Sequence, residues 1–107
     1  MKISIASPKD KERIALIWKL SFGSSDDFFE LFYTKAYPHS RTYIVLEAGE
    51  IVSAATIIKS NFVADIPSKG GYLYGVCTHP DHRGKGYAKR VIEYATEEAL
   101  KWGMEYI

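Results

Sequence analysis

The chain has 107 residues, which is enough for one compact domain and too few for two. Its composition, 47% hydrophobic and 25% charged, is ordinary for a globular protein and excludes a disordered chain. Fourteen basic residues against thirteen acidic ones leave a net charge of +1, which argues against nucleic acid or an anionic membrane as a partner.

The chain begins with a pattern that predicts a strand and then a helix. Residues 2–6 alternate polar and apolar side chains, as a half-buried strand does. Ser7 suits an N-cap and Pro8 suits the first turn of a helix, so a helix is expected to start here. The face of this helix that should be buried carries Ile14, Ile17, Trp18 and Ser21.

A second helix and a hairpin are expected next. Two aspartates favour a helix start near Ser25, and Pro38 should end that helix. Strands are expected at 42–47 and 51–59, joined by a tight turn at residues 49–50.

The second half of the chain predicts a strand, a helix and the start of another strand. Residues 60–71 contain several breakers, 72–78 reads as a strand and 79–82 as a short loop. A long amphipathic helix is expected from about Gly84 to Lys101, and a further strand begins at 104–107.

The element order is therefore β-α-α-β-β-β-α-β. It predicts one mixed α/β (α+β) domain over residues 1–107, with a mainly antiparallel sheet and helices packed on it. The single cysteine, Cys77, excludes an intrachain disulfide, and no apolar run is long enough for a signal peptide or a membrane span. A cytoplasmic protein is expected.

The segment 76–88 is the part of the sequence that indicates chemistry. A strand ends, a loop turns, and a glycine-rich stretch opens a helix, whose first backbone N–H groups point outward together. Gly84 and Gly86 let a ligand approach the backbone closely. The basic residues nearby are Arg83, Lys85, Lys89 and Arg90. This arrangement predicts a phosphate or pyrophosphate site.

Two familiar phosphate-binding motifs do not fit. A P-loop needs Ser or Thr after Gly84-Lys85, where Gly86 stands, and a dinucleotide-binding fingerprint needs a glycine where Lys89 stands.

The stretch 83–88, Arg-Gly-Lys-Gly-Tyr-Ala, resembles the signature of the GNAT superfamily of N-acetyltransferases at every fixed position. That signature is Arg or Gln, two residues, Gly, one residue, then Gly or Ala. The lead-in at 76–82 also looks like this family's strand and loop. The resemblance implies the GNAT fold, a mainly antiparallel sheet with helices on both faces.

The resemblance also implies acetyl-CoA as cosubstrate and direct acetyl transfer to a primary amine. The residues it assigns to cofactor binding are Val76, Cys77, Thr78, Arg83, Gly84, Lys85, Gly86, Tyr87, Ala88 and Lys89. By position, the Val76 amide would polarise the thioester carbonyl. Where many members carry a glutamate base, this chain offers Tyr72 and Tyr74. Tyr72 is taken as the catalytic candidate, and the general base and general acid stay unassigned.

Other reactive side chains are expected to have ordinary roles. Cys77 lies in a buried-looking strand and is expected to be a small core residue and not a nucleophile. His79 and His82 are expected to be solvated loop residues, since no set of ligands surrounds them, and no metal is expected. The aromatic helix at 28–37 is expected to serve the core first, with an edge on the acceptor site.

The sequence stops at Ile107, where members of the family usually continue, so a truncated domain is expected. The strand at 104–107 would lie beside 72–78 with an open edge, which a homodimer or fraying would relieve. The alternative function is therefore a GNAT-like fragment that binds coenzyme A without turnover. The amine acceptor, a small molecule or a peptide, is not identified by the sequence.

Overall fold

The computed structural model describes residues 1–23, 26–59 and 70–104. Its strands are β1 (Lys2–Ile5), β2 (Ser40–Glu47), β3 (Glu50–Lys59) and β4 (Gly71–Thr78), and its helices are α1 (Lys11–Phe22), α2 (Asp26–Lys35) and α4 (Tyr87–Lys101). Short 3-10 turns occur at Pro8–Asp10, Tyr37–His39 and Pro80–His82. The strand expected at 104–107 lies, apart from Met104, outside the described residues.

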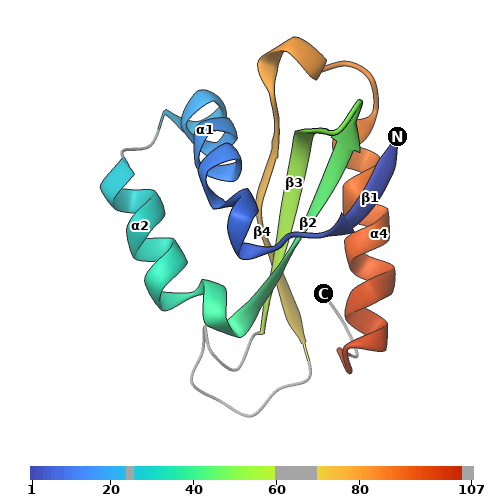
Figure 1. Ribbon diagram of the computed structural model, residues 1–107. Helices are drawn as coiled ribbons and strands as arrows, with labels where there is room; N and C mark the ends of the chain where they lie inside the picture. The colour runs from blue at the N-terminus through green and yellow to red at the C-terminus, as the bar shows by residue number, and fades with distance from the viewer. Residues whose placement is uncertain (24–25, 60–69, 105–107) are drawn as a thin grey trace.

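The four strands form one antiparallel sheet in the order β1-β2-β3-β4. Figure 1 shows α1 and α2 on one side of this sheet and α4 on the other. The central strand β3 is buried from Ile51 to Ile58 because helices cover both of its faces. The predicted fold class, a mixed α/β domain with a mainly antiparallel sheet and helices on both faces, is confirmed.

Each face of the sheet carries its own apolar core. Under α1 and α2 the core is built around Trp18, whose side chain is 2% exposed, together with Ile17 and Phe29. Under α4 the core is built around Val91 and Ala95, which are fully buried. No helix within the described residues is both long and apolar enough to cross a membrane.

The first helix starts later than expected. The chain makes a 3-10 turn at Pro8–Asp10 before α1 begins at Lys11. The Asp10 carboxylate accepts hydrogen bonds from the Ser7 N–H at 2.9 Å and from the Ser7 hydroxyl at 3.1 Å. Ser7 and Asp10 therefore do stabilise the entry to the helix, but through this extra turn.

The hairpin turn lies one residue before the predicted position. Its two central residues are Ala48 and Gly49, with φ of 52° and 80°. Two positive φ values are what a type I′ turn requires, and this turn matches the right-handed twist of β2 and β3. A non-glycine residue at the first position concealed the turn in the sequence.

The long helix begins at Tyr87 and not near Gly84. Gly84 and Gly86 have φ of 79° and 80°, which lie outside the right-handed helical region. The glycine-rich stretch is therefore a turn that precedes α4 and is not its first turn.

A β-bulge interrupts β4 in its middle. The pairing with β3 shifts by one residue, so that Gly75 and Val76 together lie opposite Ala55. Gly75 has φ of 64°, and a Cβ atom there would lie 2.5 Å from Cζ2 of Trp18. Both the backbone conformation and the close approach of Trp18 require glycine at this position.

We therefore expect Gly75→Ala to destabilise the fold. The positive φ costs roughly 1–2 kcal/mol for a residue with a Cβ, and overpacking against Trp18 costs roughly 1–3 kcal/mol more. Urea denaturation followed by circular dichroism should show a clear fall in the midpoint.

A double-mutant cycle separates the two causes. Trp18→Phe replaces the indole, whose Cζ2 the new Cβ would meet, with a smaller ring, so the combination with Gly75→Ala should cost less stability than the sum of the single changes. Strict additivity, or a Gly75→Ala midpoint equal to that of the parent, would show that the contact does not constrain the bulge.

Candidate functional site

A cavity of about 360 Å³ opens where β4 ends and α4 begins. It is lined by Ser21, Phe22, Val76, Cys77, Thr78, His82, Arg83, Gly84, Gly86, Tyr87 and Ala88. Most of the residues that the sequence assigned to cofactor binding therefore meet around one cavity. Lys85 and Lys89 do not line it and are exposed.

The glycine turn leaves the wall of this cavity open. A Cβ atom on Gly84 or Gly86 would have no protein atom within 4 Å. The first bond of α4 runs from the Arg90 N–H to the Gly86 carbonyl at 3.2 Å, so the helix does not use the amides before Arg90. Together with the helix dipole, these amides make the turn suited to a phosphate group.

The outer edge of β4 presents backbone groups beside the glycine turn. The His79 N–H donates to the Val52 carbonyl of β3 at 2.8 Å. Because backbone groups alternate along an antiparallel pair, Thr78 directs its own groups away from β3. Among the described residues no strand pairs with this edge. An extended ligand arm could therefore bond to it.

Arg83 ties the turn to β4 and to α1. Its Nε donates to the Thr78 carbonyl at 3.2 Å, and its Nη2 donates to the Ser21 hydroxyl at 3.4 Å. The Ser21 hydroxyl in turn donates to the Thr78 carbonyl at 3.4 Å. Ser21 was not among the predicted site residues, although its place on the inner face of α1 was a signal that could have found it.

Tyr87 is held on the opposite side of the turn. Its hydroxyl donates to Glu47 Oε2 at 2.7 Å, and the N-terminal ammonium of Met1 lies 3.5 Å from Glu47 Oε1. The hydrogen bond from Tyr87, helped by the N-terminal charge, lowers the pKa of Glu47, and the same bond raises the pKa of Tyr87. The Tyr87 hydroxyl therefore stays protonated and anchors α4 to β2.

His82 differs from the expected solvated histidine. It lines the cavity, and its Nδ1 atom is buried without a hydrogen-bond partner among the described residues. Its ring lies against those of His79 and Tyr87, with centroid distances of 5.8 and 6.4 Å. The Nδ1 atom is thus a buried polar group that the contacts of the described residues leave unsatisfied.

Cys77 is buried, as the sequence predicted, with 4% of its surface exposed. Burial raises the pKa of its thiol to about 12. The thiolate, which is the nucleophilic form, is therefore scarce at neutral pH.

A second cavity, of about 320 Å³, lies next to the first. It is lined by Trp18, Phe22, Phe28, Tyr74 and Gly75. Phe22 borders both cavities, and Gly75 directly precedes Val76 of the first one. Tyr72, the catalytic candidate from the sequence, lines neither of them.

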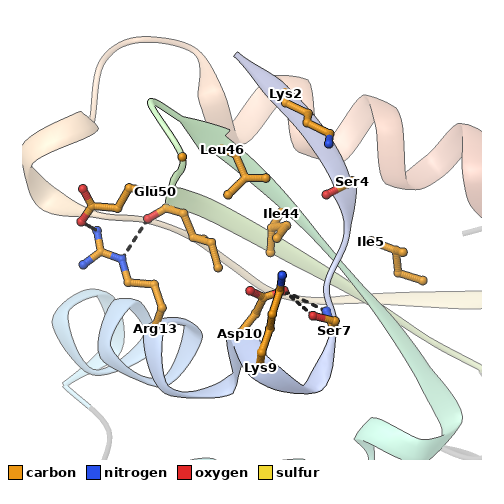
Figure 2. Close-up of a pocket in the computed structure, with 12 residues that line it drawn as sticks. Lys2, Ser4, Ile5, Ser7, Lys9, Asp10, Arg13, Ile44, Leu46 and Glu50 are labelled. Atoms are coloured by element: carbon orange, nitrogen blue, oxygen red, sulfur yellow. Dashed lines mark hydrogen bonds and ion pairs between the residues drawn. The ribbon is translucent and has the colours of Figure 1, made fainter.

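Another cavity, of about 530 Å³, lies elsewhere, between β1, β2 and the start of α1 (Figure 2). Its acidic groups are already engaged: Glu50 pairs with Arg13 at 2.6 Å, and Asp10 accepts from Ser7. None of the predicted site residues lines it. Within the described residues, no group of three His, Cys, Asp or Glu side chains could hold a metal ion.

Comparison with known proteins gives a consistent result. A family model described as "Acetyltransferase (GNAT) family" matches residues 11–107. No curated protein matches the chain.

Several solved structures share the fold. The ribosomal-protein-S18-alanine N-acetyltransferase from Escherichia coli matches with a TM-score of 0.77 at 14% identity, over 96% of this chain and 61% of that one. An aminoglycoside 6'-N-acetyltransferase complexed with coenzyme A matches with a TM-score of 0.77 at 17% sequence identity. The match covers 96% of this chain and 57% of that one. A predicted acetyltransferase with acetyl-CoA from Clostridium acetobutylicum matches with a TM-score of 0.74 at 22% sequence identity. The match covers 99% of this chain and 77% of that one.

These identities are too low to transfer a substrate. The likeness shows the fold alone, and the chain spans 61% and 57% of the lengths of the first two structures.

The burial of Cys77 predicts an unreactive thiol. At pH 8 a thiol-specific reagent such as Ellman's reagent should label the native protein far more slowly than the urea-unfolded protein, because burial suppresses both access and ionisation. The rate of absorbance change measures this. Native labelling as fast as that of the unfolded chain would contradict the buried position.

Proposed function

The chain belongs to the acetyltransferase (GNAT) family, and on that premise we propose that it transfers the acetyl group of acetyl-CoA directly to a primary amine. The observation that carries this proposal is the cavity in which the outer edge of β4 meets the glycine turn before α4. One part of it suits a pyrophosphate, and the other suits an extended arm that ends in a thioester.

The cofactor is placed from its charged end inward. The pyrophosphate lies on the backbone amides from Gly84 to Ala88, where no side chain fills the space. Lys85 and Lys89 are exposed nearby and add positive potential without forming the wall. The Arg83 side chain is already bonded to Thr78 and Ser21, so its first role is to fix the shape of the turn.

The pantetheine arm runs along β4 as an added strand. The Thr78 carbonyl already accepts bonds from Arg83 and Ser21, so the Thr78 N–H is the group left for the arm. Val76, two residues earlier, lies in the bulge, and its amide serves as the donor to the thioester oxygen. Cys77, between them, faces the core and takes no covalent part.

The transfer needs a neutral amine. A free alkylamine has a pKa of about 10.4, so its ammonium must first lose a proton. The nitrogen lone pair then attacks the thioester carbon, the C–N bond forms, and the C–S bond breaks. The products are an amide and coenzyme A, whose thiolate takes up a proton. Tyr74, which lines the cavity beside Gly75, is better placed to contact the amine than Tyr72.

The rival function is a module that binds coenzyme A without turnover. The two differ in one measurement: release of free thiol from acetyl-CoA in the presence of a panel of primary amines. Amine-dependent thiol release supports acetyl transfer. Tight binding of coenzyme A by calorimetry with no thiol release for any amine supports the rival.

Substitution of Gly86 tests where the pyrophosphate lies. Gly86→Ala should lose affinity for coenzyme A by at least about tenfold, because the new methyl group enters the open space over the amides and strains a residue with φ of 80°. Isothermal titration with coenzyme A measures the change.

Gly49→Ala is the matched control. Gly49 also has φ of 80° and open space around it, but it lies in the β2–β3 hairpin. Both variants should therefore lose a similar roughly 1–2 kcal/mol of stability, and only Gly86→Ala should lose affinity. Equal affinities in the two variants would refute the placement of the pyrophosphate.

A further inference from the structure

We infer that the acceptor is a primary monoamine with an apolar, preferably aromatic body, held in two adjoining cavities between α1, α2 and β4, with Lys35 at their far end rejecting a second positive charge. This inference deepens the proposed function and rests on it for the place of transfer. It concerns the choice among amines, which the family does not decide.

The near cavity is walled by aromatic rings. The Trp18 ring lies 6.4 Å from that of Phe28 and 5.7 Å from those of Phe22 and Tyr74, measured between centroids. Phe28 and Phe22 are the more exposed members of this set, at 46% and 50%, whereas Trp18 is 2% exposed. Such a wall favours an apolar body, and ring faces attract a single ammonium group.

A further cavity of about 320 Å³ extends this space along α2. It is lined by Phe28, Leu31, Phe32, Lys35, Ala36, Ile58, Tyr72 and Tyr74. Phe28 and Tyr74 border both cavities, so the two form one groove. Two of these residues are largely exposed, Leu31 at 59% and Tyr72 at 49% of their surface. The groove therefore has room for an apolar body longer than the near cavity alone.

The groove has a defined near end and far end. The near end meets the cofactor cavity at Phe22, and Gly75 there is followed by Val76, the proposed donor to the thioester. The amine nitrogen must lie at this end. The body of the acceptor then points along α2 toward Lys35, the last residue of that helix.

The charges of the described residues along the groove argue against polycationic acceptors. Among the described residues that line it, none carries a carboxylate, and the charged one is Lys35. A second or third ammonium would need carboxylate partners to offset its loss of hydration. At the far end it would meet the Lys35 ammonium instead, and like charges at short range repel.

A pair of probes of equal length isolates this charge effect. Hexylamine and 1,6-diaminohexane differ only in the second amino group, and 2-phenylethylamine against ethylamine tests the apolar body. Binding is measured by calorimetry with the protein saturated with coenzyme A, and transfer by thiol release from acetyl-CoA. We expect hexylamine to bind more tightly and to be acetylated faster than 1,6-diaminohexane, each by about tenfold or more. We expect the same advantage in affinity and rate for 2-phenylethylamine over ethylamine.

Reversal of the charge at Lys35 gives the second test. Lys35→Glu should raise affinity for 1,6-diaminohexane and narrow or invert the preference for hexylamine. Lys19→Glu is the matched control, because Lys19 is an exposed lysine on α1 that lines neither part of the groove and its substitution changes net charge equally. Both substituted positions are exposed, so both variants should fold.

The outcomes distinguish this inference from the proposed function. A diamine that binds the parent as well as hexylamine, equal preferences in the two variants, or no binding of any monoamine would overturn the inference. Thiol release with polyamines preferred would support acetyl transfer and defeat the inference. Selective monoamine binding without thiol release would support the groove and defeat acetyl transfer.

Discussion

The contact between the indole of Trp18 and the backbone of Gly75 is the constraint on which the site depends. Trp18 comes from α1, and its ring also packs on Phe29 and Phe32 of α2, with centroid distances of 5.2 and 4.7 Å. One side chain therefore joins both helices to β4. The indole occupies the space where a side chain at Gly75 would lie, so glycine is required at the bulge, where Val76 leaves the regular ladder.

The glycine turn, by contrast, is held by polar contacts on two sides and left bare in the middle. On one side Arg83 bonds to Thr78 and to Ser21 of α1, and on the other Tyr87 bonds to Glu47 of β2. These anchors fix the ends of a turn whose glycines contribute no side chain. The turn thus keeps its shape without filling the space that an anion would use, which is a form of preorganisation.

Local patterns predicted the features that depend on neighbours in the sequence. Helix faces, strands and the glycine turn follow from spacing, glycine and charge, and the structure confirms the fold they imply. The bulge was not predicted, and its contact with Trp18 joins residues 57 positions apart in the sequence, which no local pattern reveals. A glycine inside a strand pattern was nevertheless a signal of close approach. Arg83 was predicted as a source of charge, whereas its bonds to two other elements could not be seen without the fold.

The absence of a carboxylate among the described residues that line the aromatic groove bears on how an amine could react there. A carboxylate beside the amine would bind the ammonium firmly and would raise its pKa, so that the reactive neutral form became scarcer. Ring faces attract an ammonium more weakly, while loss of hydration in an apolar site lowers the pKa of the amine. An aromatic wall therefore binds the ammonium form more weakly than a carboxylate would. In return, a larger fraction of the bound acceptor is the neutral amine, which is the form that attacks the thioester. Apolar contact with the body of the acceptor can restore the affinity, and it does so equally for both protonation states of the amine.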